Sequence, residues 1–358
     1  MKKILFILPD LNQGGAERIV TTLLNHLDKN IFYLQLILMR KEGYYLNFIP
    51  NEVQIIDLKI NKIRNSLVPI LFQIKKQKPD IVFCGYGEVN AFLSPFIKLF
   101  PKTKFIARET NVVSKHVVRK EIKFFYKFYN NFHAIIAQSE DMKMDLIQNF
   151  NIKEDKITLI NNPVDFDFIN NQLKNQNIPH EFQISNSKKV VAIGNLTHRK
   201  GFDNLLQVFS HLQHQNIELF IIGAGRDKEQ LLHLKEKLNL QKVHFLGKKD
   251  NPFPYLKFAD LFILASRYEG FPNVLLEAGA CGIYSLANNC PGGINEIIQT
   301  KINGEVSNIE NYTEFSEKIV DVLVEKKSSE NITHSIKSRY SKDIILKKYN
   351  NIFVKILK

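Results

Sequence analysis

Two glutamates with seven residues between them stand out in the stretch SRYEGFPNVLLEAGACG, residues 266–282. Glu269 precedes a Gly-Phe-Pro corner, and Pro272 suits the first position of a helix that would carry Glu277 on its second turn. The backbone N–H groups of Asn273 and Val274 would then face a ligand, and Glu277 could accept hydrogen bonds from two neighbouring hydroxyls, as in a ribose. Taken alone, the pattern is better explained by a surface carboxylate at Glu269 and a solvated helix residue at Glu277.

A second candidate is the basic loop in IGNLTHRKGFDNLL, where an apolar run ends at Gly194 and Arg199 and Lys200 precede Gly201. Cations near the start of a helix are unfavourably placed, because that end of the helix dipole attracts anions. A bound anion would explain both features, whereas a solvated loop with ordinary basic residues is the alternative.

A pair of glycines, Gly14 and Gly15, falls between an apolar run and a helical pattern in PDLNQGGAERIVTTLLNHL. Glycines at such a turn let the backbone approach a ligand at a helix amino terminus. The pair lacks the G-x-G-x-x-G spacing of a dinucleotide fold, and a plain loop is the alternative.

Short apolar runs alternate with helical patterns along the chain, which predicts βαβ units and parallel sheets in an α/β protein. Residues 166–189 are polar, Asn-rich and poorly periodic, so we interpret them as a linker region. The tail spaces Ile345, Tyr349, Ile352 and Ile356 as one helical stripe. The expected strands are 4–8, 34–39, 53–57, 81–84, 104–107, 134–137, 157–160, 190–193, 217–222, 243–246, 261–265 and 283–287.

The bulk composition is that of a folded protein with two domains. The chain has 358 residues, 44% hydrophobic residues, 24% charged residues and a formal net charge of +13. That charge predicts attraction to an anionic partner such as nucleic acid, phospholipid or a phosphorylated substrate. The apolar start is too short for a signal peptide, and no apolar run is long enough to span a membrane. The three cysteines have no metal-ligand spacing and fit a reducing compartment. We therefore expect a cytoplasmic protein.

The spaced motifs together resemble the retaining glycosyltransferases of family 4, which have the GT-B fold of two facing Rossmann-like domains. EGFPNVLLE is similar to the E-x7-E motif of that family. The resemblance covers nearly the whole chain through NQGGAER, NNPVD at 161–165, GNLTHRKG, IIGAG, VHFLG and CPGGINEII at 290–298. It implies an N-terminal acceptor-side domain over 1–165, a nucleotide-sugar-binding domain over 190–335, and a C-terminal helix over 336–358 that in such enzymes often packs back on the first domain.

The resemblance also implies roles for particular residues. Lys200 and Arg199 would neutralise a nucleotide diphosphate approached by Gly14 and Gly15, Glu277 would hold the ribose, and Glu269 would bind the donor sugar. Phe271, Asn273 and Val274 would supply backbone contacts beside the phosphates.

The chain departs from the family pattern at two positions. Asn195 stands where many relatives carry Arg, so Lys200 and its neighbours must meet the diphosphate charge. Glu109, in ARETN, stands where many relatives carry a catalytic His; a carboxylate there could bind sugar hydroxyls, and whether it takes over the His role stays open. The Asp165-Phe166-Asp167 triplet mimics a metal motif of a different transferase fold, and we assign Asp165 to the domain ending instead.

A basic segment, SKHVVRKEIKFFYKFYNN, carries Lys115, Arg119, Lys123 and Lys127 at intervals of four residues. On a single helix these cations form one stripe, with Val118, Ile122, Phe125 and Tyr129 on a separate side. Such a stripe could hold a lipid diphosphate headgroup at an anionic membrane surface. A solvated helix face is the alternative.

These observations predict a retaining glycosyltransferase that moves a hexose or N-acetylhexosamine from a uridine diphosphate donor to a lipid-linked saccharide. The prediction needs no metal ion or other cofactor, and it places the enzyme at the inner face of the cell membrane. A soluble acceptor is the first alternative. A basic nucleic-acid-binding protein is the alternative from another class, and the scattered lysines and missing RNA-binding motif speak against it.

Overall fold

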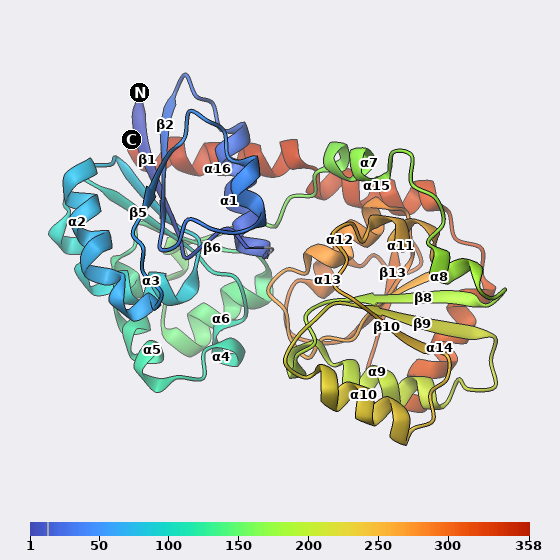
Figure 1. Cartoon of the computed structure of the whole chain (residues 1–358). Coiled ribbons are helices and arrows are strands. Elements are labelled where there is room, and N and C mark those ends of the chain that lie inside the picture. Colours follow the sequence, from blue (N-terminus) through green and yellow to red (C-terminus); the bar gives the residue numbers. More distant parts are fainter. Residues whose placement is uncertain (13) are drawn as a thin grey trace. The chain divides into compact units, whose positions relative to one another are not determined.

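The computed structural model describes residues 1–12 and 14–358, and Gln13 of the NQGGAER motif lies outside this description. The chain divides into two compact units (Figure 1). Unit 1 comprises Met1–Pro163 and Asp343–Lys358, and unit 2 comprises Val164–Lys342. Each unit contains one parallel sheet covered by helices, so the expected α/β GT-B architecture of paired Rossmann-like units is confirmed.

The sheet of unit 1 has seven strands: β1 (Lys2–Leu8), β2 (Phe32–Leu38), β3 (Gln54–Asp57), β4 (Ile81–Cys84), β5 (Lys104–Arg108), β6 (Ala134–Ala137) and β7 (Ile157–Leu159). Their order is β3-β2-β1-β4-β5-β6-β7, and all the pairings are parallel. The central strands, such as β4 and β6, are continuous apolar runs because both faces of the sheet are buried there.

Alternate strand residues of unit 1 face two separate cores. Leu5 and Ile7 point into one core, and Ile4 and Phe6 point into the other. The helices that cover these faces are α1 (Gly15–His26), α2 (Leu67–Gln77), α3 (Gly87–Leu93), α4 (Val113–His116), α5 (Lys120–Phe125), α6 (Glu140–Phe150) and α16 (Lys342–Leu357), with 3-10 helices η1 (Tyr44–Phe48), η2 (Ile63–Asn65), η3 (Ser94–Leu99), η4 (Tyr126–Asn131) and η5 (Glu154–Lys156).

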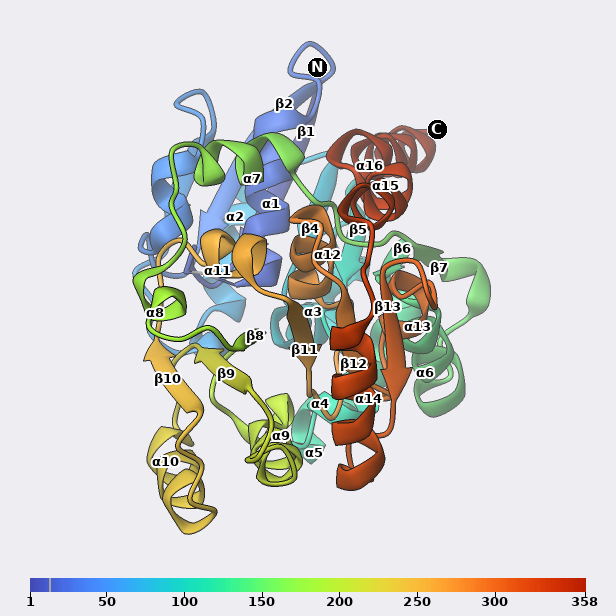
Figure 2. The same ribbon diagram turned by 90° about the vertical axis from the view of Figure 1, so that its right-hand side faces the viewer.

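The sheet of unit 2 has six parallel strands: β8 (Lys188–Ile193), β9 (Ile217–Ile222), β10 (Val243–Gly247), β11 (Leu261–Leu264), β12 (Ser285–Asn288) and β13 (Gly304–Ser307). Figure 2 shows them side by side in the order β10-β9-β8-β11-β12-β13. Their helices are α7 (Phe166–Leu173), α8 (His180–Gln183), η6 (His198–Lys200), α9 (Phe202–Ser210), α10 (Lys228–Lys237), α11 (Phe253–Phe258), α12 (Asn273–Ala280), α13 (Ile294–Ile297), α14 (Tyr312–Val324) and α15 (Ser329–Tyr340).

Helix α16 completes unit 1 although it follows unit 2 in the sequence, and Figure 1 draws it in red against the blue strands. Its stripe of Ile345, Tyr349 and Ile352 is buried, together with Phe353, in the same core as β1. The phenol of Tyr349 accepts a hydrogen bond of 3.1 Å from Nε of the buried Arg108. The expected single helix over 336–358 is in fact two helices, because Ser341 is extended and forms a parallel bridge with Val164 between α15 and α16.

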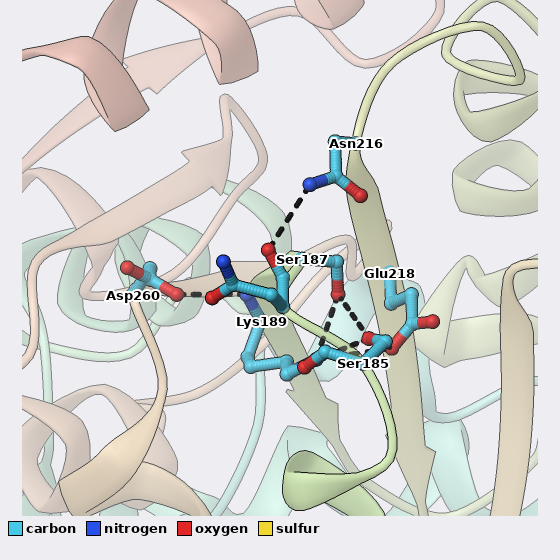
Figure 3. A network of polar contacts seen from close by, with 7 residues as sticks. Ser185, Ser187, Lys189, Asn216, Glu218 and Asp260 are labelled. Atoms are coloured by element: carbon cyan, nitrogen blue, oxygen red, sulfur yellow. Dashed lines mark hydrogen bonds and ion pairs between the residues drawn. The ribbon is translucent and has the colours of Figure 1, made fainter.

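The range 166–189, which we interpreted as a linker region, contains α7 and α8 and belongs to unit 2. Its end is fixed by the polar network in Figure 3 at the amino ends of β8 and β9. The ammonium of Lys189, which is only 6% exposed, donates to the hydroxyls of Ser185 and Ser187 at 2.7 Å each and pairs with Glu218 at 3.2 Å. Because a buried charge is costly unless it is fully hydrogen-bonded, this network determines the path of the chain into the sheet.

Every expected strand is present, and the structure adds β13, whose sequence Gly-Glu-Val-Ser has no apolar run. Among residues 1–12 and 14–358, no helix combines the length and the apolar character needed to cross a bilayer.

Candidate donor site

The site lies in unit 2, at the carboxyl ends of β8 and β11. After these neighbouring strands the chain continues toward opposite edges of the sheet, from β8 to β9 and from β11 to β12. In open parallel sheets this switch point is where ligands bind. The loop 194–201 follows β8, and the loop 265–272 follows β11.

The two loops meet at the carboxylate of Glu269, which is 5% exposed. One carboxylate oxygen accepts from Nη1 of Arg199 at 2.6 Å, and the other accepts from Nζ of Lys200 at 2.5 Å. The hydroxyl of Ser266 donates to the Lys200-bound oxygen at 2.6 Å. The structure therefore brings together Arg199, Lys200 and Glu269, three residues that the sequence analysis selected from separate motifs.

The cations determine the ionisation of this cluster. Burial alone would raise the pKa of Glu269, but the positive charges of Lys200 and Arg199 outweigh it and hold that pKa at about 2. Burial lowers the pKa of Lys200, and the charge of Glu269 acts in the opposite direction. The cluster therefore consists of one carboxylate that forms ion pairs with two cations.

Two glycines allow the loops to pack this closely. Gly201 has a φ of 65°, and a Cβ there would lie 2.0 Å from the carbonyl oxygen of Ala265. Gly292 has a φ of 131°, and a Cβ there would lie 2.7 Å from the carbonyl oxygen of Glu269. A side chain at Gly201 would push the β8 and β11 loops apart, and one at Gly292, in the loop after β12, would displace the backbone of Glu269.

Helix α12 starts one residue later than expected, because Pro272 is its N-cap and Asn273 its first helical residue. Asn273 and Val274 therefore lie in the first turn, where backbone N–H groups point out of the helix end. Glu277 lies on the second turn and is half-buried. The ring of Phe271 packs in the core, with its centroid 5.4 Å from that of Tyr340, so only the backbone of this residue is available to a ligand. The donor-binding roles of these four residues stay predictions.

Gly14 and Gly15 lie in unit 1, where Gly14 is the N-cap and Gly15 the first residue of α1. A Cβ on Gly14 would lie 2.1 Å from the carboxylate of Glu17, so a side chain there would displace this carboxylate. Their approach to the diphosphate also stays a prediction.

Glu109 follows β5 in unit 1 and is 3% exposed. Its carboxylate accepts hydrogen bonds from the phenols of Tyr129 at 2.6 Å and Tyr126 at 3.4 Å, and from the amide of Asn90 at 3.4 Å. Burial raises its pKa, while these three hydrogen bonds and Arg108 act against the shift. The stacked rings of Tyr126 and Tyr129 thus hold this carboxylate in a fixed position.

The expected single basic helix over 115–129 was wrong. The segment is divided into α4, α5 and η4, because the backbone is extended at Val117 and Arg119. Adjacent β-branched residues, Val117 and Val118, disfavour helix there. Val118 consequently lies outside, at 80% exposure, rather than on a buried face with Ile122.

The corrected segment exposes cations and apolar side chains together. Phe124 is 52% and Phe128 36% exposed, and the ammonium of Lys127 lies 5.1 Å from the ring centroid of Phe124. Arg119 forms an ion pair with Glu88. We call the exposed basic and apolar residues of this segment the 115–128 surface: Lys115, Val118, Arg119, Lys120, Lys123, Phe124, Lys127 and Phe128; His116 and the acidic Glu121 are exposed beside them.

Sequence reasoning missed two residues beside the donor site, Ser266 and Arg267. Ser266 is fully buried and donates to Glu269. Arg267 forms an ion pair with Asp203 across the two loops. Both lie within three residues of Glu269, so their proximity in the sequence was the available signal.

The Asp165-Phe166-Asp167 triplet has a structural role. Asp165 caps α7 by accepting from the N–H of Phe168 at 3.0 Å, and it pairs with Lys342 at 3.1 Å.

Comparison with known proteins identifies the family. The family model for Glycosyltransferase Family 4 matches residues 13–168, and the model for glycosyl transferases group 1 matches residues 174–339. The chain therefore belongs to the family 4-like glycosyltransferases with the GT-B fold, and it is a glycosyltransferase.

Individual relatives agree with this assignment. An uncharacterized glycosyltransferase of Methanocaldococcus jannaschii is 30% identical over 68% of this chain, and the match spans 63% of that protein's length. N-acetylgalactosamine-N,N'-diacetylbacillosaminyl-diphospho-undecaprenol 4-alpha-N-acetylgalactosaminyltransferase of Campylobacter jejuni is 28% identical over 98% of this chain and 93% of its own. Among solved structures, Anabaena HepE in complex with UDP-glucose has a TM-score of 0.83 at 17% identity, over 99% of this chain and 100% of HepE, which supports the fold.

Proposed function

We propose that this glycosyltransferase transfers a hexose or N-acetylhexosamine from a UDP-sugar to a lipid-linked saccharide in bacterial polysaccharide or glycan assembly, with retention of configuration. The observation that carries the donor half is the pair of cations, Arg199 and Lys200, at the switch point of unit 2. A diphosphate carries the charge that these two residues complement, and Arg binds phosphate oxygens through parallel N–H groups.

Glu269 has a double role in this proposal. Its low pKa keeps it ionised, so that it can accept hydrogen bonds from sugar hydroxyls at any physiological pH. When the diphosphate takes up part of the charge of Arg199 and Lys200, one carboxylate oxygen becomes available to the sugar. Glu277, one helical turn into α12, would bind the ribose hydroxyls.

In this proposal, retention of the anomeric configuration depends on the cations that neutralise the leaving diphosphate. Cations that neutralise the leaving diphosphate stabilise the negative charge that develops as the glycosidic bond breaks. The diphosphate can then take the proton of the incoming hydroxyl on the same face of the sugar, so the new bond forms where the old one broke. Arg199 and Lys200 supply this neutralisation without a metal ion.

The relatives support the acceptor half. The Campylobacter enzyme is named for an acceptor on diphospho-undecaprenol and for an α linkage, and HepE was solved with UDP-glucose. In unit 1 the 115–128 surface combines cations with exposed aromatic rings, the composition that binds an anionic membrane interface. We propose that this surface brings the enzyme to the lipid-linked acceptor as a peripheral membrane protein.

A panel of nucleotide sugars tests the function directly, with thermal stabilisation and sugar transfer as the two measurements. We expect UDP-sugars to stabilise the protein and to give an α-linked product in the proton NMR spectrum, with transfer unchanged by a chelator. An inverted product, or complete inhibition by the chelator, would contradict the proposed mechanism. Equal transfer to a water-soluble saccharide without lipid would favour the soluble-acceptor alternative.

A further inference from the structure

Arg267 links the two loops of the donor site. Its guanidinium donates to both carboxylate oxygens of Asp203, at 2.8 and 2.7 Å, and to the carbonyl oxygen of His198 at 2.6 Å. Its own backbone N–H donates to the carbonyl oxygen of Arg199 at 2.8 Å. A single residue on the β11 loop therefore contacts the first two residues of η6 and the first turn of α9.

These contacts enclose the segment that carries the donor-site cations. Arg199 and Lys200 lie in η6, a single 3-10 turn that ends at the left-handed Gly201. Such a short turn has little stability of its own, and long basic side chains have many rotamers. The position of the two cations therefore depends on what fixes their backbone.

The guanidinium of Arg267 donates to groups outside the Glu269 cluster. The partners that its guanidinium contacts are Asp203, the His198 carbonyl and, at 3.4 Å, the amide oxygen of Asn204. None of these belongs to the Glu269 cluster. The contribution of Arg267 to donor binding must act through the loop that it holds.

We propose that Arg267 is a positioning residue for the donor site: its fork on Asp203 and the His198 carbonyl fixes the β8 loop, so that Arg199 and Lys200 are prepared for the diphosphate. This inference rests on the proposed function for the nature of the ligand, but the loop fixation itself does not. The alternative is a surface ion pair with no effect, since isolated exposed pairs contribute little. Bidentate geometry and a third, backbone acceptor favour the positioning role, because they restrict orientation as well as distance.

The first test needs no ligand. In Arg267→Met, we expect hydrogen–deuterium exchange of the amides in 195–201 to become about tenfold faster, as expected when a local contact that closes a loop is lost. Amides of β9 serve as the internal reference for global unfolding. Lys318→Met is the matched control, because it removes the partly exposed Lys318–Glu305 pair of 2.6 Å, which joins α14 to β13 and contacts neither loop.

The second test measures donor binding and turnover. Arg267→Met should raise the Kd of the UDP-sugar about tenfold, because small displacements of binding groups are costly, and leave the acceptor concentration for half-maximal rate unchanged. Arg267→Lys keeps the charge without the fork and should recover only part of the affinity.

The outcomes separate the two proposals. Unchanged loop exchange in Arg267→Met, or exchange and affinity changes no larger than in Lys318→Met, would overturn the positioning role. If the parent protein bound no nucleotide sugar, the proposed function would fail, and the exchange experiment alone would decide whether Arg267 fixes the loop.

Discussion

Lys200 and Glu269 are bound to each other, so a donor phosphate must share the cation with a carboxylate that is already present. Lys200→Ala should therefore weaken binding of the nucleotide sugar by about 1.5–3 kcal/mol, the usual contribution of a hydrogen bond to a charged group, or roughly 10- to 100-fold in Kd. Isothermal calorimetry measures the loss. Lys237→Ala, which removes an exposed lysine from α10, is the control, and equal affinities in the two variants would remove Lys200 from the site.

A second prediction at this scale concerns the protonation of Glu109. Burial raises its folded-state pKa, so between the ordinary value of about 4.3 and the raised value the folded protein binds more protons than the unfolded chain. Stability should consequently fall as the pH rises through this window, and Glu109→Gln should lack that contribution. Calorimetric unfolding at pH 5, 6.5 and 8 measures both proteins, and parallel pH dependences would show that Glu109 stays ionised.

Charged residues next to glycines in strand-to-helix turns are a local signal, but Glu269 was selected together with Arg199 and Lys200 only through the family resemblance, and the structure shows that the three side chains contact one another. The hydrogen bonds from Tyr126 and Tyr129 to Glu109 were not predictable, since they depend on how η4 folds back onto the end of β5. The place of Arg267 two residues before Glu269 was a signal, but its contact with Asp203 was not predictable. Its partner Asp203 lies 64 positions away, and only the packing of the two loops brings them together.

At the scale of elements, the 115–128 surface is built from two short helices and a 3-10 turn whose cations are all exposed. Each Lys or Arg near an anionic leaflet contributes about 1 kcal/mol, so reversing Arg119, Lys123 and Lys127 together to Glu should abolish sedimentation with anionic liposomes. Transfer to a lipid-linked acceptor should slow, while hydrolysis of the donor stays near the parent rate.

The control for this surface is a triple reversal of Lys237, Lys347 and Lys348, exposed lysines that give the same change in net charge. Replacing Phe124 and Phe128 by Ser should also weaken liposome binding. The size of this loss should depend little on salt, because screening acts only on charges. Liposome binding that survives both the charge reversal and the Ser replacements would leave this segment as a solvated surface.

Strands were the most predictable elements, because a parallel sheet buried on both faces requires apolar runs such as that of β4. β13 was not predicted because it is an edge strand of the sheet, next to β12, and its sequence is polar. The helix break at Val117 was not predicted because the four-residue spacing of the cations suggested one continuous helix. The backbone is extended there instead, next to two β-branched residues, and Ile122 is buried on the helix that follows.

At the scale of the whole molecule, the last helix belongs to the first unit. Phe353 is fully buried, with its ring centroid 5.8 Å from that of Phe83 and 6.1 Å from that of Phe32. Phe353→Ala should destabilise unit 1 by about 3–5 kcal/mol through the cavity it leaves. The buried side chains of α16 pack in a core of unit 1, so we expect the unfolding transition of unit 2 to stay in place. Calorimetry combined with hydrogen exchange at β4 for unit 1 and at β9 for unit 2 distinguishes the two units. Val354→Ala on the same helix is the control. Equal destabilisation of both units by Phe353→Ala would contradict this assignment.

The place of α16 has a consequence for synthesis on the ribosome. Unit 2 has all its residues once the chain has emerged as far as Lys342, whereas unit 1 lacks Tyr349 and Phe353 until residues 343–358 follow. In the interval, the nascent chain exposes the apolar face of β1 and β4, and the guanidinium of Arg108 lacks the phenol that it binds in the finished protein. Exposed strands of this kind are aggregation-prone. The second half of the polypeptide is thus able to mature before the first, and chaperones that recognise apolar strands have their substrate here during translation.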